Sequence, residues 1–213
     1  MAATDRVLYG TALSVYCCKL RLALALKGLA LPETPPPDGY TSAAYRRIVP
    51  QGTVPALIEG DFVLTESDAI IEYLDEIGAG RPLMPQGARM RARARALSRQ
   101  IDTRLEPAAR ALFPFVGARL PVPEAARQAL TRPLDMVARG ADGGRYLSGT
   151  ATPGLPDCGY WAVRAVLEAL EGALGLGLDL PETEPPPTPE SAEVLETYRR
   201  TLAGWVTQKM EGA

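Results

Sequence analysis

The sequence predicts an α/β region at the start of the chain, followed by an all-helical region. Two observations carry this prediction. Short apolar strands flank a tight turn within 54–64, as in a β-hairpin. Beyond the glycine- and proline-rich segment 78–85, apolar residues recur at helical spacing. We therefore expect one domain over 1–80, a linker over 81–86 and a helical domain over 87–213.

The elements of the first region follow from local patterns. Arg6 to Tyr9 is predicted as a strand, and Val15 to Leu26 as a helix that Gly28 ends. The segment 29–39 should hold a second strand, but its four prolines leave room only for a very short edge strand. A short helix is expected over 40–49.

The predicted hairpin begins with a proline that cannot donate a ladder hydrogen bond. Val54 to Glu59 forms the first strand, Gly60-Asp61 the turn and Phe62 to Leu64 the second strand. A cis bond between Val54 and Pro55 would leave the backbone N–H and C=O groups of Val54 unpaired. An extended peptide can pair with such an edge.

A helix start follows the hairpin at Thr65-Glu66-Ser67. The Ser67 hydroxyl, the free N–H groups of the first turn and the helix dipole favour a bound carboxylate. Glu66 beside them suits an ammonium group. The arrangement fits the zwitterionic end of a γ-glutamyl peptide, with Val54 facing its cysteinyl backbone. The alternative is an ordinary hairpin followed by a capped helix.

The second region is predicted to contain four helices. Gly154 stands three residues before Asp157, where a capping box would have a serine or threonine. The box is therefore incomplete, and we expect that helix to begin at Asp157. The four helices are expected near 87–117, 123–139, 156–173 and 189–208.

Composition excludes several classes of function. Of the 213 residues, 46% are hydrophobic, as in an ordinary globular protein. The 23 basic and 25 acidic residues leave a net charge of −2, so we expect neither nucleic acid nor a membrane as a partner. We expect a cytoplasmic protein without a signal peptide, and its three cysteines fit a reducing compartment. The chain has no histidine. This excludes serine–histidine triads and most zinc sites, and we expect no metal.

The motifs Pro50-Gln51-Gly52, Val54-Pro55 and Glu66-Ser67 give residues 1–80 a resemblance to the thioredoxin-like domain of cytosolic glutathione transferases. The resemblance continues more loosely into the helical remainder. It implies a glutathione transferase fold, glutathione as cosubstrate, a homodimer and a second-substrate pocket formed by the helical domain. It also implies that Val54, Pro55, Glu66 and Ser67 bind glutathione.

The segment Ser14-Val15-Tyr16-Cys17 lies where this family places its catalytic side chain. It resembles the Cys-Pro-Tyr-Cys of glutaredoxins and the serine-led segment of tau and zeta classes, which suggests a serine-type bacterial member. The resemblance implies that Ser14 stabilises the glutathione thiolate. A plain helix cap is the alternative for Ser14. Cys17, one turn later, is a candidate redox thiol or a small buried side chain.

The helix predicted near 87–117 borders the second-substrate pocket in this family and carries many arginines. We expect Tyr16, Arg95 and Arg99 in that pocket, where an arginine would select an anionic electrophile. A solvated helix face or a dimer contact are the alternatives. The expected reaction is conjugation of the glutathione thiolate to a small electrophile. A glutathione-dependent thiol–disulfide oxidoreductase or peroxidase and a non-catalytic interaction module are the competing functions. The arginines of the helix predicted near 87–117 are residues 89, 91, 93, 95, 99, 104 and 110.

Overall fold

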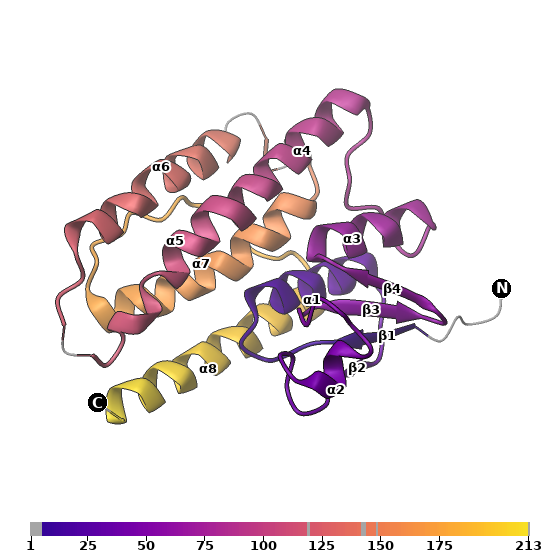
Figure 1. Ribbon diagram of the computed structural model, residues 1–213. Coiled ribbons are helices and arrows are strands. Elements are labelled where there is room, and N and C mark those ends of the chain that lie inside the picture. Colours follow the sequence, from indigo (N-terminus) through magenta and orange to yellow (C-terminus); the bar gives the residue numbers. More distant parts are fainter. Residues whose placement is uncertain (1–5, 119, 142–143, 148, 213) are drawn as a thin grey trace.

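A four-stranded mixed sheet precedes a set of helices in the computed structural model, which describes residues 6–118, 120–141, 144–147 and 149–212 (Figure 1). The strand order is β2-β1-β3-β4, with β1 and β2 parallel and the other neighbours antiparallel. The strands are β1 (Arg6–Tyr9), β2 (Glu33–Thr34), β3 (Ala56–Glu59) and β4 (Phe62–Thr65). The predicted hairpin is confirmed, although its first strand begins at Ala56 rather than at Val54, because the residues before it form the cis-proline loop. The predicted very short edge strand is β2, which has two residues.

Three helices accompany the sheet: α1 (Val15–Lys27), α2 (Ala43–Arg46) and α3 (Ser67–Glu76). Helix α1 ends at Gly28, whose φ of 69° is left-handed and favours glycine. Helix α2 is shorter than the predicted 40–49, because the Ser42 hydroxyl caps it by accepting from the Tyr45 N–H at 3.0 Å.

The prediction of one helix over 87–117 is wrong. This stretch divides into α4 (Ala88–Gln100), the π-helical segment η1 (Ile101–Leu105), α5 (Glu106–Arg110) and the 3₁₀ turn η2 (Phe113–Phe115). Pro107 has no N–H to donate to the Thr103 carbonyl, and its ring would clash with that group in a regular helix. The wider turns of η1 accommodate this defect.

The other helices lie close to their predicted positions: α6 (Glu124–Ala141), α7 (Leu155–Leu174) and α8 (Pro189–Glu211). Helix α7 begins at Leu155, two residues before the predicted start. The Asp157 carboxylate reaches back to the backbone N–H groups of Gly154 and Leu147, both at 2.8 Å. Since Gly154 has no side chain, only this half of the capping box forms.

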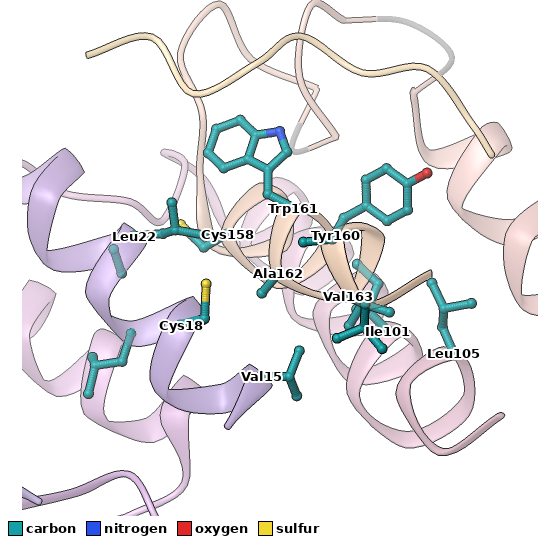
Figure 2. Packing of buried hydrophobic residues seen from close by; sticks show 14 of the residues in the cluster. Val15, Cys18, Leu22, Ile101, Leu105, Cys158, Tyr160, Trp161, Ala162 and Val163 are labelled. Atoms are coloured by element: carbon teal, nitrogen blue, oxygen red, sulfur yellow. The ribbon is translucent and has the colours of Figure 1, made fainter. Parts of the chain in front are cut away.

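Helix α1 joins the sheet to the helical part through one continuous apolar core. Val15, Cys18 and Leu22 of α1 face α7, where Cys158 and Ala162 are also fully buried (Figure 2). Helix α8 packs against both α1 and α7. This packing fixes the start of α1, and with it Ser14, relative to the helical part of the chain.

No helix within the described residues is long and apolar enough to cross a membrane. The same residues contain no group of three or more histidine, cysteine or acidic side chains placed to hold a metal ion. The expectation of no signal peptide concerns in part residues 1–5, which lie outside the described residues.

Candidate functional site

A cavity of about 1030 Å³ lies where the start of α1, the loop before β3, the start of α3 and the α4-to-η2 stretch meet. All but one of the side chains predicted for the site line it; the exception is Cys17. The residues it brings together are Ser14, Tyr16, Val54, Pro55, Glu66, Ser67, Arg95 and Arg99.

The loop before β3 presents an unpaired stretch of backbone to the cavity. The Val54-Pro55 peptide bond is cis. Among the described residues, the backbone N–H and C=O groups of Val54 have no hydrogen-bond partner. The buried Tyr45 hydroxyl donates to the Thr53 carbonyl oxygen at 2.8 Å and holds the preceding residue in place. An extended peptide can therefore pair with a fixed edge at Val54.

The start of α3 forms another wall of the cavity. Glu66 is exposed and has φ 72° and ψ 115°, a backbone region that residues with side chains rarely occupy. Ser67, the first residue of α3, is only 5% exposed yet lines the cavity. The unpaired N–H groups of a ten-residue helix and its dipole attract an anion to this point.

Ser14 caps α1 at the cavity wall. Its hydroxyl oxygen accepts a hydrogen bond from the Cys17 backbone N–H at 3.2 Å. A hydroxyl that accepts through its oxygen still carries one hydrogen to donate. The cap alternative and the thiolate-stabilising role are therefore compatible at this position.

Cys17 lies behind the cavity wall. It is 2% exposed and does not line the cavity. Burial raises the pKa of the Cys17 thiol, although interactions with Ser14 and with the backbone of Thr11 act in the opposite direction. A thiol with a raised pKa and little exposure is a poor redox nucleophile.

The Tyr16 side chain lines the cavity, but its hydroxyl is already engaged. This hydroxyl lies 3.1 Å from both the Glu106 carboxylate and the Asp102 carbonyl oxygen, each an acceptor. Burial, followed by the nearby charges of Glu106 and Asp102, raises the pKa of the Tyr16 phenol. Arg110 pairs with the same Glu106 carboxylate. Tyr16 therefore belongs to the polar wall of the cavity.

The two arginines expected in the cavity differ in their partners. The Arg95 guanidinium forms hydrogen bonds to the Glu72 carboxylate, at 2.8 Å from Nε to Oε2. Arg99 is exposed at the cavity, and no side chain among the described residues pairs with its guanidinium. Arg99 is therefore the better candidate to meet an anionic ligand.

Comparison with known proteins finds glutathione transferases both by sequence and by fold. A family model for the glutathione S-transferase N-terminal domain matches residues 8–82. Glutathione S-transferase Z1 of Arabidopsis thaliana is 45% identical over 78 residues, which is 35% of each chain. The structure of an epsilon-class glutathione S-transferase from the housefly Musca domestica superposes with a TM-score of 0.79 at 19% identity, covering 96% of this chain and 98% of the other. Residues 8–82 thus match the glutathione S-transferase N-terminal domain, and the chain as a whole has the fold of this transferase structure.

The likeness in sequence to these relatives covers only part of the chain. A stringent starvation protein A homolog of Pasteurella multocida is 35% identical over 95 residues, 45% of each chain. The chain thus spans less than half the length of these two curated relatives. The structural likeness at 19% identity establishes the fold of the helical part.

Sequence reasoning missed several charged side chains in and behind this cavity. Asp68 and Asp102 line it, and Glu106 and the buried Lys19 lie directly behind. The sequence held one sign that Lys19 is buried. Lys19 lies at helical spacing between the apolar residues Val15 and Leu22, and therefore on the same face of the helix. A lysine on the buried face of a helix requires partners that local sequence does not identify.

Proposed function

We propose that this chain is a serine-type glutathione transferase. It conjugates the glutathione thiolate to a small electrophile in the cavity between the glutathione-binding domain, residues 1–80, and the helical domain, residues 87–213. The supporting observation is that one cavity collects Ser14, the Val54-Pro55 edge and the start of α3 at Ser67. These are the three chemical functions that an extended γ-glutamyl thiol peptide requires.

The γ-glutamyl and cysteinyl parts of glutathione each have a complementary group in the cavity. The γ-glutamyl carboxylate binds at the Ser67 hydroxyl and the first turn of α3, and the adjacent ammonium group faces Glu66. The cysteinyl backbone pairs with Val54, as an added strand does, beside Pro55. The sulfur then meets Ser14, whose hydroxyl donates to it.

The chemistry needs little beyond a stabilised thiolate and correct placement. Hydrogen bonding from Ser14 and the positive end of α1 favour loss of the thiol proton. The thiolate then attacks an electrophilic carbon, a sulfur–carbon bond forms, and a leaving group departs or an adjacent oxygen accepts the electron pair. Because the chain has no histidine, no imidazole base takes part.

We propose that the electrophile is small and carries a negative charge. Arg99 faces the cavity without a partner among the described side chains, whereas Arg95 and Arg110 already pair with carboxylates. Tyr16 and Phe113 supply aromatic surface in the same cavity. We further propose that the protein acts in the cytoplasm as a homodimer, which light scattering during size exclusion would detect.

Steady-state kinetics with glutathione test this function. The assay pairs a neutral aryl halide or enone with a carboxylate-bearing counterpart. Ser67→Ala should raise the KM for glutathione roughly tenfold or more, because a hydrogen bond to a charged group contributes about 1.5–3 kcal/mol. Ser191→Ala is the matched control, since Ser191 is a buried serine in the first turn of α8 and lies outside the cavity.

Two outcomes would overturn the proposal. Equal glutathione kinetics in the Ser67 and Ser191 variants would exclude the assigned site. Glutathione binding without turnover of any electrophile would favour a non-catalytic role. That alternative is worth testing because one group of relatives carries the name stringent starvation protein A rather than a transferase name.

A further inference from the structure

A buried lysine lies beneath the candidate site. The Lys19 side chain is 1% exposed. Its Nζ lies 3.0 Å from the Ser98 hydroxyl and 2.6 Å from the Asp102 carboxylate, and it also pairs with Asp68. An ammonium group has three N–H donors, and here each donor has an acceptor. This lysine is therefore fully satisfied without solvent.

The partners of Lys19 come from separate elements around the cavity. Asp68 lies in the first turn of α3, next to Ser67. Ser98 lies at the end of α4 and donates to Asp68 at 3.1 Å. Asp102 lies in η1, and its carbonyl oxygen accepts from Tyr16 of α1. The ammonium of Lys19 thus connects α1, α3 and η1 at the point where all three border the cavity.

The charge of Lys19 matters for an anion bound at the start of α3. Asp68 and Asp102 place two carboxylates at the cavity wall, where they would repel a ligand carboxylate at Ser67. Burial alone lowers the pKa of Lys19, but the charges of Asp102 and Asp68 raise it above its ordinary value. The ammonium therefore stays charged at neutral pH and offsets the carboxylates.

We propose that Lys19 is a positioning residue for the γ-glutamyl end of glutathione. It holds the first turn of α3 against η1 and neutralises the carboxylates beside Ser67, without touching the ligand. This inference rests on the proposed function, because it takes glutathione as the peptide bound at Ser67.

The same helix supplies a matched comparison. Lys27 is also buried, pairs with Asp75 and donates to the Arg81 carbonyl oxygen at 3.0 Å. None of these three residues lines the cavity. Loss of Lys27 therefore reproduces the structural cost of an unpaired buried carboxylate without altering the charge at Ser67.

The test compares Lys19→Met with Lys27→Met by calorimetric titration with glutathione and by thermal unfolding. Both variants should have a lower Tm. Only Lys19→Met should weaken glutathione binding, by about tenfold or more, because misplacement at a binding site and charge repulsion act together. The Lys27 variant should bind within about twofold of the wild type, a change near 0.4 kcal/mol.

A milder variant keeps the inference testable if Lys19→Met does not fold. Ser98→Ala removes the hydroxyl that bonds to both Lys19 and Asp68. The charges of Lys19 and Asp68 stay in place. The Ser98 variant should weaken glutathione binding by roughly two- to fivefold, about 0.4–1 kcal/mol, because Lys19 still pairs with Asp68 and Asp102 and keeps the first turn of α3 partly in place.

The possible failures are distinguishable. A wild type that binds glutathione, together with Lys19 and Ser98 variants that bind it equally well, overturns the positioning role and leaves the proposed function intact. Equal weakening in the Lys19 and Lys27 variants also overturns it, since the effect would be one of general stability. A wild type that binds no glutathione overturns both proposals.

Discussion

The Ser14 hydroxyl oxygen accepts a hydrogen bond from the Cys17 backbone N–H at 3.2 Å while facing the main cavity. One side chain thus caps α1 and keeps a hydrogen available for a ligand. The same contact fixes the backbone of Cys17 in the first turn of α1, and the Cys17 side chain lies on the buried side of that helix.

Ser14→Ala is expected to affect both roles of this side chain. Loss of the cap should lower the free energy of unfolding by about 1 kcal/mol. Loss of the hydrogen bond to the thiolate should raise the pKa of bound glutathione by roughly one to two units. The thiolate absorbance of bound glutathione, followed against pH, measures this change.

Thr188→Ala is the control for the capping effect. Thr188 caps α8 by accepting from the Ser191 N–H at 3.2 Å, outside the cavity. It should lose similar stability and leave the pKa of bound glutathione unchanged. A thiol pKa unaltered by Ser14→Ala would reduce Ser14 to a helix cap.

Cys17→Ala should retain the conjugating activity. The thiol is 2% exposed, and burial raises its pKa, so little thiolate is present at neutral pH. Alkylation of native Cys17 should accordingly be slow at pH 7 and become faster as the pH rises. Peptide mapping after iodoacetamide treatment measures the rate.

Cys158→Ala, which also removes a buried thiol, is the control for the loss of packing in Cys17→Ala. Activity lost only with Cys17 would support the thiol–disulfide alternative.

Arg99→Gln should raise the KM for a carboxylate-bearing electrophile and leave the KM for a neutral analogue unchanged. Arg99 is exposed, and pairs between exposed charges contribute about 0.2–1 kcal/mol, so the increase should be roughly two- to fivefold. Arg93→Gln, on the same helix but outside the cavity, is the control. Equal effects on charged and neutral substrates would remove Arg99 from substrate selection.

Tyr45→Phe should weaken glutathione binding from a distance. It removes the hydrogen bond from the buried Tyr45 hydroxyl to the Thr53 carbonyl oxygen, a loss of about 0.5–1.5 kcal/mol in unfolding free energy. The backbone edge at Val54 should then be less well fixed, and urea titration combined with calorimetry measures both effects.

Tyr160→Phe provides the comparison for Tyr45→Phe. The Tyr160 hydroxyl donates to the Pro181 carbonyl oxygen at 2.7 Å, and its side chain is also fully buried, but it lies away from the cavity. Its loss should lower stability with no change in glutathione affinity. The same fall in affinity for both variants would contradict a local role for Tyr45.

Elements that are determined by neighbouring residues could be predicted from the local sequence. The Gly60-Asp61 turn, the Gly28 helix end and the helix start at Ser67 each depend on neighbouring residues. The sequence motifs also placed Ser14 and Ser67, which the fold brings to one cavity.

Features that depend on distant partners could not be predicted in this way. The π-helical segment 101–105 arises where Pro107 interrupts a pattern that otherwise reads as one long helix. The pairing of Lys19 with Asp68 and Asp102 joins positions far apart in the chain. The burial of Cys17 likewise depends on the surrounding tertiary structure rather than on its helix alone.

Calorimetric titration of the purified protein with glutathione tests the central claim most directly. The account predicts one site per chain with a dissociation constant below about 1 mM, a binding free energy beyond roughly −4 kcal/mol. It also predicts that Ser67→Ala removes most of that binding. No heat of binding with the folded wild-type protein would contradict the account.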